Sequence, residues 1–133
     1  GKQVLWNKHC VQGTKDADFY DKLQADKAQL IIRKGYHANI DSYSAFMEAD
    51  RQTMTGLAGY LRERGITEVY VVGIATDFCV AWTALDAAAL GFVCTVIMDA
   101  TAPIDVEGSL ERAKAQMSEQ GVKFALAKDF LKN

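Results

Sequence analysis

The sequence predicts an α/β fold in which a parallel β-sheet is covered by helices on both faces. From Gln29 onward, short runs of β-branched residues alternate with helical patterns, as they do in βαβ units. Each helical pattern ends at a glycine just before the next run, and glycine is the usual helix terminator. A chain of 133 residues, 50% of them hydrophobic, has the size of one compact core. We therefore expect residues 1–133 to form a single domain.

The first predicted strand is Leu30–Arg33. A helix is expected over Ala49–Arg64, where apolar residues recur at helical intervals, and it should stop at Gly65. The next strand, Glu68–Ile74, is apolar enough to be buried on both faces, as parallel strands usually are. We therefore place this strand in the centre of the sheet.

The remaining elements repeat the same alternation. Thr76 or Asp77 can cap a helix that continues through Ala81–Leu90. After it we expect a strand, a helix and a last strand over Phe92–Met98, Ser109–Gln120 and Val122–Leu126, followed by a tail.

The opening stretch, Gly1–Asp26, has no clean period apart from a short helix expected near Asp18–Leu23. A parallel sheet that begins with a loop leaves a central position unfilled. We therefore expect the natural polypeptide to begin earlier and to supply a first strand.

Composition excludes several classes of function. The formal net charge is only −2 and the basic residues are spread out, which argues against nucleic acid or an anionic membrane as the partner. The apolar stretches are far shorter than the roughly 20 residues of a membrane span, and no signal peptide opens the chain. Three cysteines without C-x-x-C spacing indicate free thiols. We expect a soluble cytoplasmic protein.

In open α/β sheets the ligand binds beyond the carboxyl ends of the strands. Lys34, Ala75–Cys79 and Asp99–Pro103 each follow a predicted strand, so these loops should converge.

Cys79 is the candidate nucleophile, because a thiolate is stabilised at the start of a helix that follows a buried strand. The backbone N–H groups of Ala75 and Cys79 are suited to an oxyanion hole. Packing is the competing interpretation, since free cysteines are commonly buried, and Cys10 and Cys94 are best explained as core residues.

Lys34 suits an ammonium that holds a catalytic carboxylate, although a surface lysine is the competing explanation. His9 is a potential metal ligand without a second ligand at a recognisable spacing. Aromatic residues near these loops suit a flat ring, and core packing explains them equally well; they are Trp6, Tyr36, Tyr43, Phe46 and Phe78.

Taken together, these motifs resemble a known family. The segments are W-N-K-H-C-V-Q-G-T, I-I-R-K-G, D-S-Y-S-A-F, V-V-G-I-A-T-D-F-C-V and T-A-L-D-A-A-A-L-G-F. They are similar to those of the nicotinamidases and pyrazinamidases among the isochorismatase-like cysteine hydrolases, which have a Rossmann-like three-layer fold. The resemblance implies hydrolysis of nicotinamide to nicotinate and ammonia through a thioester, as part of NAD salvage.

The resemblance also implies roles for individual residues. Cys79 would be the nucleophile, Lys34 the catalytic lysine, and Ala75 and Cys79 the oxyanion hole, with a cis peptide bond between Ile74 and Ala75. His9 would be one ligand of a divalent metal, most often zinc. Trp6 and Tyr43 would line the ring pocket, and Phe78 would border it. The protein would form a homo-oligomer.

Two departures from the family pattern stand out. Asn7 and Lys8 separate Trp6 from His9, where the family usually has proline after the tryptophan. The catalytic aspartate and the Asp-x-His metal ligands of the family have no counterpart before Trp6. We therefore expect either a fragment or a second polypeptide that supplies this segment.

Three other functions are alternatives. A related hydrolase could act on another small amide or an enol ether. An incomplete α/β module could bind a ligand without turnover. A dinucleotide-binding domain is disfavoured, because G-I-A-T-D lacks the G-x-G-x-x-G turn.

Overall fold

The computed structural model describes residues 5–131. The chain divides into two compact units, Gly1–Ile31 and Ile32–Asn133, and each is described here by itself. Within the described residues, no helix has both the length and the apolarity that a membrane span requires.

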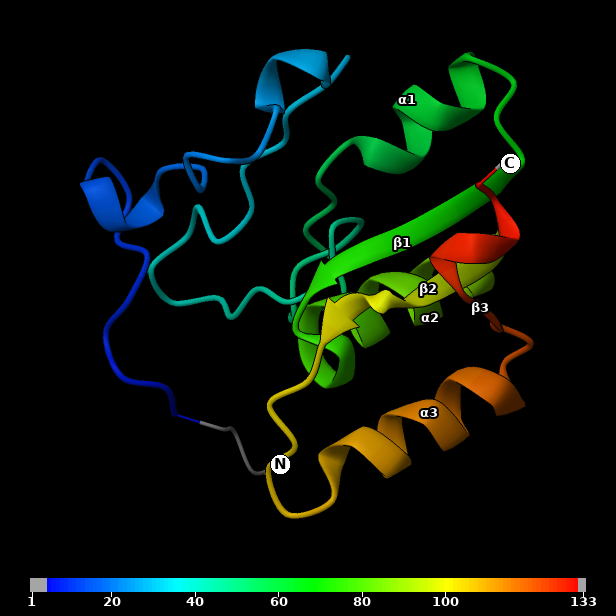
Figure 1. Ribbon diagram of the computed structural model, residues 1–133. Coiled ribbons are helices and arrows are strands. Elements are labelled where there is room, and N and C mark those ends of the chain that lie inside the picture. The colour runs from blue at the N-terminus through cyan, green and yellow to red at the C-terminus, as the bar shows by residue number, and fades with distance from the viewer. Residues whose placement is uncertain (1–4, 132–133) are drawn as a thin grey trace. The chain divides into compact units, whose positions relative to one another are not determined.

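The second unit is built on a parallel sheet of three strands, β1 (Glu68–Ile74), β2 (Val93–Ala102) and β3 (Lys123–Ala125), in that order (Figure 1). Val69 pairs with Cys94 at the β1–β2 ladder, and Thr95 pairs with Lys123 at the next ladder. Each pair of neighbouring strands is joined through a helix, so the predicted α/β class with a parallel sheet is confirmed.

Three α-helices accompany the sheet: α1 (Leu57–Glu63), α2 (Ala81–Ala89) and α3 (Ser109–Glu119). A π-helical turn, Thr76–Val80, leads directly into α2. Short 3-10 helices occupy Lys15–Ala17, Ala25–Lys27 and Ala127–Asp129. The predicted helices that end at Gly91 and Gly121 are therefore present, within one or two residues of their expected bounds.

The core lies where α2 and α3 meet the sheet. Val96 of β2 and Met117 of α3 are fully buried, as are Ala84 and Ala87 of α2. The alanine side chains are small, so the α2 backbone can approach β2 closely. Phe92, just before β2, stacks on Phe46 with 5.7 Å between ring centroids.

The prediction that Glu68–Ile74 is a central strand, buried on both faces, was wrong. Its bounds are as predicted, but β2 lies in the middle of the described sheet and β1 at its edge. Tyr70, Val72 and Ile74 are 49%, 53% and 77% exposed. An apolar strand sequence indicates that burial of both faces of the strand is favourable. It does not determine which neighbouring element buries them.

The predicted helix over Ala49–Arg64 was too long, because only α1 is helical. The preceding residues form a tight turn, in which the Asp50 carboxylate accepts the N–H groups of Gln52 and Thr53. Gly56 then adopts a left-handed φ of 93° immediately before α1, which breaks any continuous helix. Side-chain hydrogen bonds of aspartate compete with the helical ladder in such turns.

Two further predictions were wrong. Leu30–Arg33 forms no strand in the described part of the chain, since an extended segment needs a paired neighbour to become one. Asp18–Leu23 contains no helix, and the 3-10 turns lie on either side of it. Short polar segments without an apolar period carry little information about their local conformation.

Candidate active site

Cys79 lies in the turn that joins β1 to α2. The Ala75 carbonyl accepts hydrogen bonds from the N–H groups of Phe78 and Val80, at 3.1 and 3.0 Å, and these bonds hold the turn. The peptide bond between Ile74 and Ala75 is cis, as the resemblance implied. Ala75 is buried and Cys79 is half-buried. Because the turn that contains Cys79 leads directly into α2, the thiol lies at the start of a helix, where backbone N–H groups lack intrahelical partners.

Neither Thr76 nor Asp77 caps this helix, in contrast to the prediction. The Thr76 hydroxyl bonds the Thr101 hydroxyl at 2.8 Å, and the Asp77 carboxylate turns toward the loop after β2. The reason is that the π-helical turn places both side chains against neighbouring elements, where Thr76 donates to the Thr101 hydroxyl and Asp77 accepts from the Ile104 and Asp105 N–H groups.

Asp77 holds that loop with three hydrogen bonds. Its carboxylate accepts the N–H of Ile104 at 3.0 Å, the N–H of Asp105 at 2.8 Å and the hydroxyl of Ser109 at 2.5 Å. Burial alone raises the pKa of Asp77, but the Ser109 hydroxyl and the two backbone amides lower it by more, so its pKa lies below the usual value. An ionised Asp77 therefore ties the Cys79 turn to the start of α3.

Lys34 and Cys79 are brought together although 45 positions separate them. The Lys34 Nζ lies 3.6 Å from the Cys79 Sγ and donates a hydrogen bond to the Ser42 carbonyl at 2.9 Å. The Gly35 N–H donates to the Glu48 carboxylate at 3.3 Å, which anchors the backbone next to the lysine. The ammonium is thus held between the thiol and a carbonyl oxygen.

A pocket of about 380 Å³ opens beside the thiol. It lies along β1, and its lining includes Lys34, Tyr43, Cys79 and Thr83. The Tyr43 ring packs between Phe78 and Trp82, with centroid distances of 6.0 and 5.6 Å. An apolar wall with a few polar groups at one end is typical of sites for small molecules.

The other aromatic residues named from the sequence have different surroundings. Phe46 lines the same pocket, but it is 2% exposed and belongs to the core, so packing explains it as well. Tyr36 is 68% exposed and contacts the His37 ring edge-on at 6.4 Å. Trp6 lies in the first unit and is partly exposed.

His9 also lies in the first unit, and its ring orientation is defined locally. Its Nδ1 is 2.5 Å from the Asn7 carbonyl oxygen, which can only accept, so Nδ1 carries a proton, and in a neutral ring Nε2 is the electron-pair donor. Metal-bound histidines commonly show this arrangement. No three metal-ligating side chains gather at one place within residues 5–131.

The two remaining cysteines differ in burial. Cys94 is 2% exposed, as predicted for a core residue, and burial raises its pKa to about 11. Cys10 is exposed, so its prediction as a core residue was wrong. Its backbone N–H donates to the Asp16 carboxylate, which is typical of a polar loop and not of a core.

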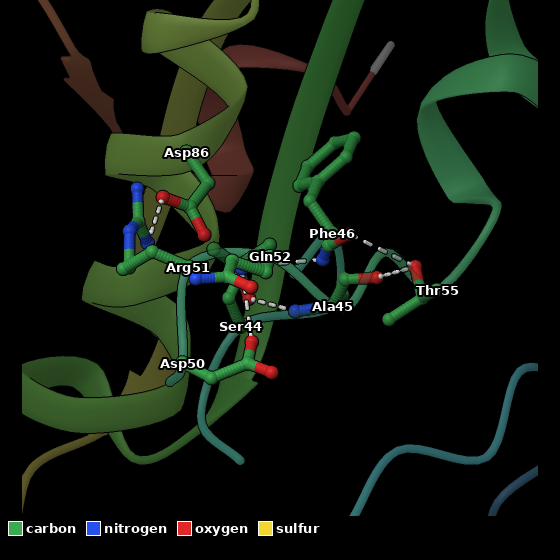
Figure 2. Close-up of polar contacts among 9 residues, drawn as sticks. Ser44, Ala45, Phe46, Asp50, Arg51, Gln52, Thr55 and Asp86 are labelled. Atoms are coloured by element: carbon green, nitrogen blue, oxygen red, sulfur yellow. Dashed lines mark hydrogen bonds and ion pairs between the residues drawn. The ribbon is translucent and has the colours of Figure 1, made fainter. Parts of the chain in front are cut away.

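Sequence reasoning missed the segment that follows Tyr43 and its attachment to α2, part of which Figure 2 shows. The Ala45 N–H donates to the Thr83 hydroxyl at 3.0 Å, and Arg51 forms an ion pair with Asp86 at 2.7 Å. Thr83 and Asp86 are three residues apart and therefore share one face of α2. The three-residue spacing of Thr83 and Asp86 was the sequence signal for this attachment. It gave no indication of Arg51 as a partner, because Arg51 was assigned to the helix predicted over Ala49–Arg64.

Comparison with known proteins identifies the family. Residues 1–129 match the family model described as the isochorismatase domain. The chain belongs to the isochorismatase domain family. Nicotinamidase from Acinetobacter baylyi is 61% identical to it over 131 residues, which are 98% of this chain and 61% of that protein.

Solved structures agree with this assignment. The Acinetobacter baumannii nicotinamidase/pyrazinamidase structure is 66% identical, has a TM-score of 0.95, and matches 97% of this chain and 62% of its own. The PnC1 structure from L. infantum in complex with nicotinate is 38% identical, with a TM-score of 0.88 over 93% of this chain and 62% of its own. A pyrazinamidase from Pyrococcus horikoshii, solved with zinc, is 37% identical, with a TM-score of 0.76 over 92% of this chain and 63% of its own. The chain thus spans about three fifths of the length of these relatives.

Proposed function

We propose that this chain carries the nucleophile of a nicotinamidase, which hydrolyses nicotinamide to nicotinate and ammonia. The observation that carries the proposal is the position of the Lys34 ammonium, 3.6 Å from the Cys79 thiol at the edge of an aromatic-walled pocket. The similarity to nicotinamidases and to a nicotinate complex supports the choice of substrate.

In the proposed reaction the Cys79 thiolate adds to the carboxamide carbon, and the carbonyl electron pair moves to oxygen. The N–H groups of Ala75 and Cys79 then hydrogen-bond that oxyanion. The C–N bond breaks, a proton is added to the departing nitrogen, and ammonia leaves. Water cleaves the resulting thioester to nicotinate and regenerates the thiol.

The protonation step requires a carboxylic acid. The family resemblance assigns it to an aspartate that has no counterpart before Trp6 in this sequence. Lys34 would orient that carboxylate as well as stabilise the thiolate, because its ammonium has three donors and the Ser42 carbonyl accepts one of them. Proton transfer of this kind contributes about 10²–10⁴-fold in rate.

The substrate ring would lie against Tyr43 and Phe78, whose rings lie 6.0 Å apart near the thiol. Trp6 is the further ring-pocket residue that we propose. Aromatic faces bury a flat ring and still leave its nitrogen free for a polar contact.

We propose that His9 provides one ligand to a divalent metal, for which zinc is the first candidate because a related pyrazinamidase was solved with zinc. The free Nε2 of His9 suits that role, although residues 5–131 supply no complete ligand set at one place. The bound metal would contribute Lewis acidity. Equilibrium dialysis with zinc should show weaker binding by a His9→Ala variant, and equal binding would remove His9 from the site.

The proposed activity is tested by ammonia release from nicotinamide, with added zinc or manganese. Because the proton-donating aspartate has no counterpart in this sequence, we expect release that is slow by about 10²–10⁴-fold, lost in Cys79→Ala and retained in Cys94→Ala, the matched control for a cysteine outside the site. Release that persists in Cys79→Ala would contradict the role of Cys79, and no release from a protein with normal circular dichroism would make this chain an incomplete or non-catalytic form.

A second test separates the nicotinamide reading from another amide. Nicotinamide should slow alkylation of Cys79 by iodoacetamide more than benzamide does, since only the former has a ring nitrogen. Equal protection by both would favour a hydrolase of other small amides. Protection without any ammonia release would favour a non-catalytic binding module.

A further inference from the structure

The segment that holds Lys34 is attached along one side of α2. Tyr43 packs its ring against Phe78 and Trp82, and two residues later the Ala45 N–H donates to the Thr83 hydroxyl at 3.0 Å. The segment after Ser42 and the segment that leads into α2 therefore run in the same direction, since later residues of one contact later residues of the other. The stretch that begins at Ser42 therefore follows the helix whose N-terminal turn carries the thiol.

The attachment is strong at its far end as well. Arg51 has a left-handed φ of 61° and pairs with Asp86 at 2.7 Å, as Figure 2 shows. The Asp86 side chain is 4% exposed, whereas that of Arg51 is 49% exposed, so arginine reaches from the surface to a buried carboxylate.

Ala45 is held from two sides between these contacts. Its N–H bonds Thr83, and its carbonyl accepts the Thr55 hydroxyl at 2.6 Å. The flanking residues Ser44 and Phe46 are 0% and 2% exposed, so this part of the segment has little freedom. The position of the backbone three residues after Ser42 is thus set by Thr83 of α2 together with Thr55.

Ser42 in turn positions the lysine. Its carbonyl accepts the Lys34 ammonium at 2.9 Å, and the same ammonium lies 3.6 Å from the Cys79 sulfur. The Ser42 N–H bonds the Asp41 carboxylate at 3.1 Å, which is a local turn contact and does not attach this segment to α2. Near Lys34, the Thr83 hydroxyl provides a hydrogen bond between this segment and α2.

We propose that Thr83 is a positioning residue, whose hydroxyl holds the Lys34 ammonium in register with the Cys79 thiol by fixing Ala45. Thr83 lies four residues after Cys79, so one helix carries both the nucleophile and the anchor for its lysine. This inference rests on the proposed function of Lys34 and Cys79. It adds a residue outside the catalytic pair that sets their distance.

The test measures alkylation of Cys79 by iodoacetamide at pH 7 in the full 133-residue chain, with Cys10→Ser as the background. Peptide mass spectrometry resolves Cys79 from Cys94. Because Cys94 is buried and its pKa is raised to about 11, its slow alkylation reports any loosening of the fold.

Thr83→Val should slow Cys79 alkylation about 3- to 10-fold, the effect of losing one net hydrogen bond. Thr83→Ser, which keeps the hydroxyl, should stay within twofold of the parent chain. Thr67→Val, the same change at an exposed threonine, should have no effect. In all three variants alkylation of Cys94 should match the parent chain.

The decisive comparison is a double-mutant cycle with Lys34→Met. If Thr83 acts through Lys34, Thr83→Val should change Cys79 alkylation less than twofold once the lysine is gone. The positioning role is overturned if Thr83→Val leaves the rate of Cys79 alkylation unchanged in the parent chain. It is also overturned if Thr83→Ser slows this alkylation as much as Thr83→Val does, or if Thr83→Val slows it equally in the Lys34→Met background.

A separate outcome would overturn the proposed function itself. If Lys34→Met alone leaves the Cys79 rate unchanged, the lysine does not activate the thiol, and the positioning role is lost with it. If Lys34→Met slows Cys79 alkylation but Thr83→Val does not, the roles of Lys34 and Cys79 are retained and only the positioning role of Thr83 is rejected.

Discussion

Replacing Asp77 by asparagine should destabilise the protein in a pH-dependent way. One carboxylate oxygen accepts the Ile104 N–H, and the other accepts the Asp105 N–H and the Ser109 hydroxyl. Asparagine has a single acceptor oxygen. In either orientation its NH₂ group faces at least one backbone N–H donor, that of Ile104 or that of Asp105, which loses its acceptor.

The magnitude follows from the number of hydrogen bonds lost. Hydrogen bonds to a charged group contribute about 1.5–3 kcal/mol each, and an orphaned donor costs a similar amount. We therefore expect Asp77→Asn to lower the free energy of unfolding by about 3 kcal/mol at pH 7. For a chain of this size that corresponds to about 10 °C in Tm. Ser109→Ala, which leaves both backbone bonds in place, should cost about half as much.

The pH dependence has a definite sign. The pKa of Asp77 is lower in the folded state, so its contribution to stability is complete above the unfolded-state pKa, near 4. That contribution is lost as the pH falls through the folded-state pKa. The difference between Asp77 and Asp77→Asn should therefore be constant from pH 7 to pH 5 and shrink at lower pH.

Urea unfolding followed by circular dichroism at several pH values measures this difference. A loss below about 0.5 kcal/mol at pH 7 would refute the assigned hydrogen bonds. A loss of the same size at pH 3 as at pH 7 would refute the role of the charge. Additive effects of Asp77→Asn and Ser109→Ala would show that the two side chains do not interact.

Three other predictions follow from burial and pairing. Val96→Ala in β2 should cost about 2–3 kcal/mol in urea unfolding, because Val96 is fully buried, whereas Val72→Ala, at a 53% exposed position, should cost less than about 0.5 kcal/mol. Cys94 should resist thiol reagents at pH 7 until the chain is denatured, and rapid reaction in the folded state would contradict its burial. Arg51→Met should lower Tm more than Asp86→Leu combined with Arg51→Met, since the single variant leaves a buried carboxylate unpaired; equal losses would argue against this ion pair.

Much of the fold was predictable because local patterns carry it. Glu68–Ile74 has the bounds expected from its apolar run, and the helices before Gly91 and Gly121 end as their glycines indicate. The stretch before Leu57 was mispredicted because the Asp50 turn and the left-handed Gly56 outweigh a helical period.

The candidate site, like the fold, was only partly predictable from the sequence. Cys79 was accessible from the sequence because its strand, turn and helix are contiguous, and the resemblance then selected Lys34, His9 and the aromatic residues. The predicted convergence of the Lys34 and Cys79 loops is confirmed, but their 3.6 Å approach could not be predicted, because it depends on contacts such as the one between Lys34 and the Ser42 carbonyl. The roles of Trp6 and His9 remain predictions.

By itself, the sequence determined the α/β class, the order of the elements from Glu68 onward and the residues able to perform cysteine chemistry, because periodicity and residue type are local properties. Only the tertiary structure decided that β1 is an edge strand of the described sheet, that Asp77 binds the loop before α3, and that Thr83 and Asp86 anchor the segment after Lys34. These features depend on which partner supplies each hydrogen bond. That choice is made by packing between residues far apart in the chain, and so it leaves no signature in a short stretch of sequence.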